Sequence, residues 1–366
     1  MRRWIGGVLT VIALSIATVL MVEGAASVAL FVSDYATATI PNTIIRPHTE
    51  YDTLLGWVNR VSFSGPDEYG RGIGFNTTPE RFRGQGPLAP LPAGRTRLIC
   101  SGDSFTMGSG VSDEGTWCAA LHRLLPDVET VNMGQGGYGV DQAYLWYRRD
   151  GARIPHQVQV LALNDVQFER SLVPTYAGRS KPYFTLDGDR LVLKNVPVPR
   201  QTMAALRRSY ATTRLVEQLR SVQAVRRIAP FDGRGRAAEE VMTRWALFER
   251  IFDELDAFHR ANGTRLAIVY LPTRRDARPS YLDERRRRLA EYAARRGVPF
   301  VDLTPALRAL PADSLELAFI SRIESGVAPG VIGHYTPAGG ARVARQLALS
   351  FAATPSLRGL IPAPPR

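Results

Sequence analysis

The chain has 366 residues, of which 45% are hydrophobic, and a formal net charge of +12. This size and apolar content argue against a disordered chain or a coiled coil, and they allow one sizeable α/β domain with appendages or two small domains. The charge comes from arginines scattered along the chain, with Lys181 and Lys194 as the only lysines, so nucleic acid is not an expected partner.

The N-terminus predicts one transmembrane helix. Arg2 and Arg3 precede an uncharged, largely apolar run over residues 4–22, close to the roughly 20 residues that cross a bilayer. Arginines before the run favour a cytoplasmic N-terminus, which places the rest of the chain outside the cytoplasm. A cleaved signal peptide is the alternative, because alanines follow at 25–26, but its apolar core would exceed the usual length of about 7–15 residues. We therefore expect a cytoplasmic stub and membrane anchor over residues 1–35.

The rest of the chain divides into an arm, a domain and a tail. Residues 36–95 are rich in Pro, Gly, Thr and Asn and lack a sustained period, which is typical of an irregular membrane-proximal arm. Beyond them, short apolar runs alternate with helical stretches. The runs are 97–101, 129–132, 158–163, 265–270 and 299–302, and the helical stretches are 116–125, 141–149, 237–261, 281–296 and 337–351. The alternation predicts a doubly wound, mostly parallel α/β domain over residues 96–355, followed by a tail at 356–366.

The alternation of apolar runs and helical stretches lapses between residues 171 and 236, which indicates an insertion in the domain. Within it, residues 187–189 (D-G-D) separate two apolar stretches and predict a hairpin turn. Segments of this kind often determine substrate selectivity, since they lie on the surface of a rigid scaffold.

An arginine run and a pair of cysteines in the domain are expected to have structural roles. Residues 285–288 are the densest arginine run and fall within the predicted helix 281–296, where we expect a solvated helix face. Cys100 and Cys118 are too few for a zinc site, so we expect no metal and two buried thiols. A disulfide between the two cysteines is the alternative outside the cytoplasm.

Four short polar stretches occur where predicted strands end or where the last helix begins. They are 101–104 (S-G-D-S), 132–137 (N-M-G-Q-G-G), 164–165 (N-D) and 333–339 (G-H-Y-T-P-A-G). The carboxyl ends of parallel strands meet at one rim of a sheet, where ligands bind, so one crevice can collect all four. Their joint order resembles the SGNH (GDSL-type) hydrolase family, whose sequence blocks carry Ser, Gly, Asn and His. The resemblance spans about 97–351, with the insertion unmatched.

This resemblance implies a flavodoxin-like SGNH hydrolase fold and a serine esterase or acyltransferase that needs no cofactor. It implies that Ser104 is the nucleophile and His334 its general base. It also implies an oxyanion hole made by the backbone N–H groups of Ser104 and Gly137 and by the side-chain amide of Asn164.

Physical chemistry supports the assignment of the base. A serine hydroxyl is a poor nucleophile until a base within hydrogen-bonding reach removes its proton. Of the five histidines, only His334 lies in a loop at a helix start. The others lie in the arm, before a strand or within helices, where structural roles are expected: His48, His156, His122 and His259. An oxyanion hole needs donors aimed at the developing charge, which a glycine N–H and an asparagine amide both provide.

The sequence departs from the family pattern at the catalytic acid. The family has an Asp two or three residues before the histidine, where this chain has Ile332 and Val331. Three alternatives remain open: a Ser–His dyad with the ring held by a backbone carbonyl, an acid supplied by Glu324 or Asp302, or loss of catalysis. A smaller departure is Ala162, which stands where the family has a glycine two residues before the asparagine.

We expect an extracytoplasmic serine esterase or O-acyltransferase that acts on acyl esters, chiefly acetyl esters, of a cell-envelope or exported polysaccharide. One alternative is a non-catalytic envelope module that binds glycans. A second is a dinucleotide-binding oxidoreductase, because residues 134–139 satisfy G-x-G-x-x-G between a strand and a helix and Asp165 ends the next strand. Against it, the motif follows the second strand, and an exported domain meets little nicotinamide cofactor.

Overall fold

The computed structural model describes most of the chain, which divides into two compact units. The described residues are 2–37, 46–202, 204–208, 211–212, 239–280, 282–321 and 330–364. The first unit comprises Met1–Ile44, Ala177–Arg179 and Gln201–Arg236, and the second comprises Ile45–Tyr176, Ser180–Arg200 and Ala237–Arg366.

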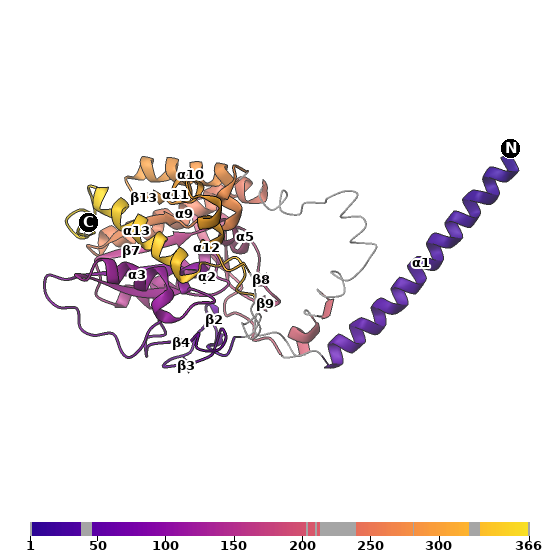
Figure 1. The fold of residues 1–366 in the computed structure, drawn as a ribbon, viewed down its shortest axis with the longest axis horizontal. Helices are drawn as coiled ribbons and strands as arrows, with labels where there is room; N and C mark the ends of the chain where they lie inside the picture. Colours follow the sequence, from indigo (N-terminus) through magenta and orange to yellow (C-terminus); the bar gives the residue numbers. More distant parts are fainter. Residues whose placement is uncertain are drawn as a thin grey trace. The chain divides into compact units, whose positions relative to one another are not determined.

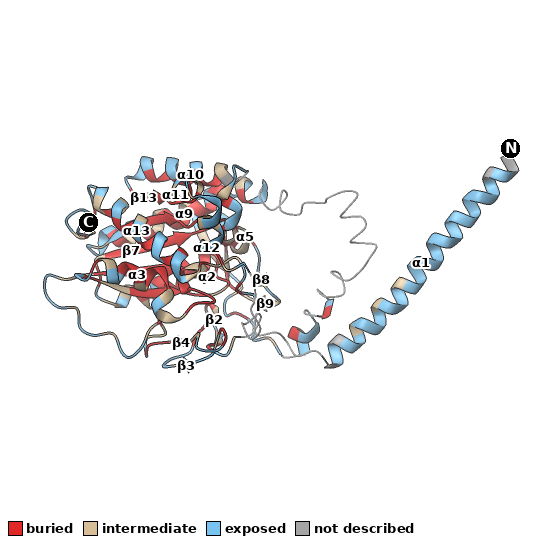
Figure 2. Ribbon diagram, in the orientation of Figure 1, coloured by how far each residue is buried: buried red, intermediate tan, exposed pale blue. Residues whose placement is uncertain are grey.

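Helix α1 (Arg2–Thr37) is the main described element of the first unit. Its segment Gly6–Ser33, 28 residues, is long and apolar enough to cross a membrane. Figure 2 shows α1 exposed along nearly all of its described length. The predicted N-terminal apolar helix is therefore present, and its length and composition suit either a membrane anchor or a signal sequence.

A five-stranded parallel sheet forms the centre of the second unit (Figure 1). Its strands are β5 (Thr96–Gly102), β6 (Val128–Gly134), β7 (Val158–Leu163), β12 (Arg265–Tyr270) and β13 (Phe300–Asp302), in the order β13-β12-β7-β5-β6. All five predicted apolar runs are strands, so the doubly wound α/β prediction is confirmed. Because β5 lies between β6 and β7, its carboxyl end is the switch point of the sheet, where α/β folds bind their ligands.

Helices cover both faces of this sheet and create two apolar cores. One core contains residues of α4 (Val140–Arg149), α9 (Trp245–Ala261) and α10 (Leu282–Arg296), and the other contains residues of α3 (Trp117–Leu124), α13 (Pro337–Ala353) and α11 (Thr304–Arg308). Neighbouring strand residues alternate between the cores, as Ile99 and Leu98 do. Figure 2 shows the strands almost entirely buried. Burial on both faces explains why these strands are nearly uninterrupted apolar runs in the sequence.

Residues 46–95 form short strands and contribute to the core of the second unit. The pairs are β1 (Thr49–Asp52) with β2 (Gly56–Asn59) and β3 (Ser64–Gly65) with β4 (Phe75–Asn76), both antiparallel. Trp57 is buried and donates a hydrogen bond from its indole nitrogen to the Gly136 carbonyl at 2.9 Å. This segment therefore packs against the loop that follows β6.

The structure also contains several short helices, strands and turns. They are α2 (Ser104–Met107), α5 (Asp165–Ser171), β8 (Thr175–Tyr176), β9 (Arg179–Ser180), β10 (Tyr183–Asp187), β11 (Arg190–Lys194), α12 (Ala312–Ala318) and short 3-10 turns at Asp113–Gly115, Gly151–Arg153 and Arg274–Ala277. β10 and β11 pair antiparallel, with Asp187 opposite Arg190, so the predicted hairpin is present. Residues 203, 209–210 and 213–236 of the expected insertion lie outside the described residues. Cys100 and Cys118 are both buried free thiols, as expected.

A buried histidine lies beneath one face of the sheet. His259 is inaccessible to solvent, and its Nε2 lies 2.8 Å from Gln159 Oε1 while its Nδ1 lies 2.8 Å from Thr264 Oγ1. Burial, together with the nearby ring of His156 and the charge of Arg148, lowers the pKa of His259 to about 3. The His259 ring therefore stays neutral in the folded protein.

We expect the protein to lose stability as the pH falls from 6.5 towards 3, because the unfolded chain protonates His259 at an ordinary pKa of 6.5 and the folded chain does not until about 3. The stabilising contribution is complete above the unfolded pKa and disappears progressively across this window. Urea unfolding of the full-length protein in detergent, with His259→Gln as the comparison, measures the effect. Stability of the variant should depend less steeply on pH; identical slopes would contradict the assignment.

Candidate active site

Ser104 lies directly beyond the carboxyl end of β5, at the switch point of the sheet. It is the first residue of α2, and Asp103 caps that helix by accepting a hydrogen bond from the Phe105 amide at 3.0 Å. Ser104 is 8% exposed. The turn between strand and helix therefore presents the serine side chain at the rim where the sequence predicts the site.

His334 contacts Ser104 directly. Its Nε2 lies 2.8 Å from Ser104 Oγ, across a separation of 230 residues. Its Nδ1 lies 3.0 Å from the carbonyl oxygen of Val331. A carbonyl can only accept a hydrogen bond, so Nδ1 carries the proton and Nε2 presents its lone pair to the serine hydroxyl. This is the tautomer that a general base requires.

The charges around His334 set its proton affinity. Burial lowers the pKa of His334, while the Asp103 carboxylate and the hydrogen bond to the Val331 carbonyl oppose that effect. The cationic side chains of Arg170 and Arg46 lower the pKa further. The imidazole is therefore neutral at physiological pH and free to accept a proton.

Gly137 lies in the loop that follows β6 and has a left-handed backbone with φ of +81°. A Cβ added there would lie 2.7 Å from Tyr176 Cε1, so the position accepts only glycine. Among the described residues, neither the Gly137 amide nor the Ser104 amide donates a hydrogen bond to a protein acceptor. Both N–H groups can therefore donate to a bound group.

Asn164 follows β7 and is inaccessible to solvent. Its Nδ2 lies 3.1 and 3.0 Å from the two carboxylate oxygens of Asp103. Arg170 Nη1 joins the same carboxylate at 2.9 Å and the Tyr138 carbonyl at 3.2 Å. The structure thus brings the loops that follow β5, β6 and β7 together at one place.

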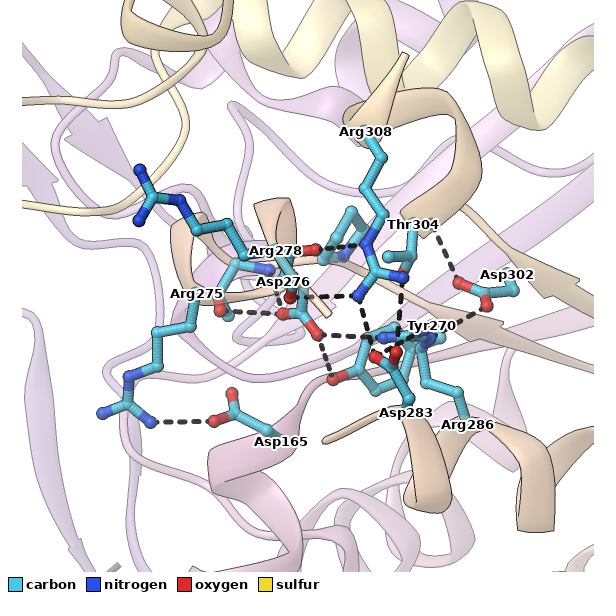
Figure 3. A network of polar contacts seen from close by, with 12 residues as sticks. Asp165, Tyr270, Arg275, Asp276, Arg278, Asp283, Arg286, Asp302, Thr304 and Arg308 are labelled. Carbon is cyan, nitrogen blue, oxygen red and sulfur yellow. Dashed lines mark hydrogen bonds and ion pairs between the residues drawn. The ribbon is translucent and has the colours of Figure 1, made fainter. Parts of the chain in front are cut away.

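Asp302, one of the two candidate acids, lies in a polar network between β13, α10 and α11 (Figure 3). Its Oδ2 is 3.0 Å from Arg286 Nε, and its Oδ1 accepts a hydrogen bond from the Thr304 amide at 2.8 Å. Within the described ranges, the contacts of Asp302 do not include His334, whose Nδ1 faces a backbone carbonyl. Glu324, the other candidate, lies outside the described residues. The described geometry is that of a Ser–His dyad.

The arginine run 285–288 differs from the solvated face that the sequence predicted. Arg285 and Arg286 are buried, at 1% and 8% exposure. Arg285 donates to the Asp165 carbonyl at 2.9 Å, and Arg286 also pairs with Asp283 at 2.9 Å. The prediction was wrong for these two because Glu169 on α5 pairs with Arg285 and Asp302 on β13 pairs with Arg286. The sequence of one helix does not reveal such partners.

We expect Asp302→Asn to lower stability and leave kcat unchanged. The substitution removes an anion from the buried Arg286, at a cost of about 1–3 kcal/mol. Thermal unfolding and ester turnover measure the two effects separately, with Asp283→Asn as a matched loss of charge in the same network. A fall in kcat as severe as that of His334→Ala, with the fold intact, would instead make Asp302 the catalytic acid.

Two side chains at the site were missed in the sequence. A backbone carbonyl holding the imidazole was one of the open alternatives, and the structure identifies it as that of Val331. Arg170 lies within α5, six residues after Asn164, and nothing in that spacing marks it. The Tyr176 ring lies against Gly137, and the Arg170 guanidinium carbon lies 4.7 Å from the centre of that ring.

The similarity of this chain to known proteins lies mainly in the α/β domain. The profile of the GDSL-like Lipase/Acylhydrolase family matches residues 100–342. Among solved structures, a member of the lipolytic protein G-D-S-L family from Veillonella parvula is 14% identical, with a TM-score of 0.36, over 69% of this chain and 95% of its own. A GDSL-like lipase from Bacteroides thetaiotaomicron is 10% identical, with a TM-score of 0.36, over 71% and 89%. An α/β hydrolase from the metagenome of Lake Arreo is 15% identical, with a TM-score of 0.38, over 73% and 98%. No match was found among curated proteins.

Proposed function

Because the chain belongs to the GDSL-like lipase/acylhydrolase family, we propose that it is a serine esterase or O-acyltransferase in which Ser104 is the nucleophile and His334 the general base. The observation that carries this proposal is the 2.8 Å contact between Ser104 Oγ and His334 Nε2. The family match includes residues 134–139, which favours an oxyanion loop over a dinucleotide site for that glycine-rich stretch.

The proposed reaction has two steps. Ser104 Oγ attacks the ester carbonyl carbon as His334 Nε2 takes the hydroxyl proton, and the oxyanion accepts hydrogen bonds from Ser104, Gly137 and Asn164. When the tetrahedral intermediate collapses, Nε2 returns the proton to the leaving alkoxide and an acyl-serine remains. Water, or the hydroxyl of an acceptor, then gives its proton to Nε2 and attacks the acyl carbon. As the bond between the acyl carbon and Ser104 Oγ breaks, Nε2 returns that proton to Oγ, which releases the acyl group and restores the free serine.

We place the substrate among acyl esters, chiefly acetyl esters, of a cell-envelope or exported polysaccharide. Two observations support this choice. Arg2 and Arg3 before α1 favour an N-terminus in the cytoplasm and a catalytic unit outside it. The half-buried Tyr176 ring against Gly137 gives a sugar ring an aromatic surface beside the reacting carbonyl.

A panel of activated esters of increasing acyl length, together with acetylated glycans, tests the proposal on the full-length protein in detergent. We expect turnover of the shortest esters, loss of turnover in Ser104→Ala, and acyl transfer to added glycan hydroxyls if the enzyme is a transferase. Binding of glycans without turnover of any ester would instead favour a non-catalytic envelope module.

A further inference from the structure

Asp103 lies beneath the candidate site and is fully buried. Its carboxylate accepts hydrogen bonds from three groups: the Phe105 amide, the Asn164 side-chain amide and the Arg170 guanidinium. A buried carboxylate needs such donors, because an unpaired charge in the interior is strongly disfavoured. Two of these donors, Asn164 and Arg170, are contributed by the segment that follows β7.

The contact with Asp103 fixes which way the Asn164 amide points. Both carboxylate oxygens lie within 3.1 Å of Nδ2, so one N–H can be shared between them. The second N–H then has no protein acceptor in the part of the chain that the structure describes. A flipped amide would put the buried Asn164 Oδ1 against the carboxylate, where two acceptors repel. Asp103 therefore orients the Asn164 amide so that its second N–H can donate to an oxyanion.

Arg170 connects this carboxylate to the loop that carries Gly137. Its side chain is 13% exposed, and its Nη1 contacts both Asp103 and the carbonyl of Tyr138, the residue after Gly137. Its guanidinium also lies over the Tyr176 ring that packs on Gly137. The Arg170 guanidinium thereby connects the segments that supply all three expected oxyanion donors.

We propose that the Asp103–Arg170 ion pair is the positioning unit of the oxyanion hole, with Asp103 orienting the Asn164 amide and Arg170 fixing Asp103 relative to Gly137. Neither residue touches the reacting atoms, so each acts through the donors that it holds. This inference rests on the proposed function and names the residues that make its transition-state site rigid.

A double-mutant cycle on an activated ester tests the proposal. In Asp103→Asn, Arg170 and Asn164 compete for a single oxygen, so we expect kcat to fall about 10²-fold with little change in KM, as for loss of one oxyanion donor. Adding Asn164→Ala to Asp103→Asn should lower kcat little further, because both substitutions remove the same oxyanion donor, the Asn164 amide. The matched control is Glu129→Gln, which removes the partner of buried Arg97 at the opposite end of β5 and should leave kcat unchanged.

The pH profile adds a readout that a merely structural role would not move. The charged groups that act on His334 are Asp103, Arg170 and Arg46, and the Asp103 carboxylate raises the pKa of the imidazole. The acid limb of kcat/KM should therefore move to lower pH in Asp103→Asn. If that variant fails to fold, Arg170→Lys and Arg170→Met provide the test, because lysine keeps the charge and should retain more kcat than methionine.

The outcomes separate this inference from the proposed function. Ester turnover that survives Ser104→Ala overturns the proposed function itself. If Ser104→Ala abolishes turnover but Asp103→Asn and both Arg170 variants retain the wild-type kcat, only the positioning role is overturned. Additive losses for Asp103→Asn and Asn164→Ala also overturn it, whereas non-additive losses with a shifted acid limb support it.

Discussion

Ser104→Ala should lower kcat on an activated ester by about 10⁴–10⁶-fold, and His334→Ala should do nearly the same. Ser104 Oγ and His334 Nε2 are 2.8 Å apart, so the hydroxyl is activated only when both are present. The double variant should be no worse than either single variant, because residues that act as a unit are strongly non-additive.

The control for this experiment is Ser64→Ala, which removes an exposed hydroxyl from β3 and should keep wild-type kcat. Circular dichroism of each variant checks that the fold is intact. If the losses from Ser104→Ala and His334→Ala instead add in the double variant, the two residues do not work together and the dyad is wrong.

The second large effect should come from Asn164→Ala, with a fall in kcat of about 10²–10³-fold and little change in KM. The amide donor is expected to stabilise charge that develops on the carbonyl oxygen only in the transition state, so ground-state binding changes little. Steady-state kinetics on one activated ester measure both constants.

Asn262→Ala is the matched control, since it removes an exposed amide at the end of α9 and should leave both constants unchanged. An increase in KM at constant kcat for Asn164→Ala would show that this amide binds substrate in the ground state. That result would remove Asn164 from the oxyanion hole.

The sheet and its rim were predictable from the sequence for a physical reason. Parallel strands buried on both faces must be apolar along their length, and β5, β7 and β12 are recognisable as such runs. Since their carboxyl ends meet at one edge, the place of Ser104 at that rim followed from topology. Its pairing with His334, 230 residues away, was implied by the family resemblance.

The partners of the site residues were not predictable in the same way. The Val331 carbonyl that holds the imidazole is a backbone group, whose position depends on the loop conformation rather than on the side chain. Arg170, which is half-buried, and Arg285, which is buried, have carboxylate or carbonyl partners that come from other segments of the chain. The composition of one helix cannot distinguish such residues from solvated arginines.

The central claim is that Ser104 is a nucleophile activated by His334. A serine-directed fluorophosphonate, followed by intact mass and peptide mapping of the full-length protein, tests it most directly. We predict one phosphonyl adduct on Ser104, no adduct in Ser104→Ala and much slower labelling in His334→Ala. Labelling at another residue that persists in Ser104→Ala, or none under conditions where the protein cleaves esters, would contradict the claim.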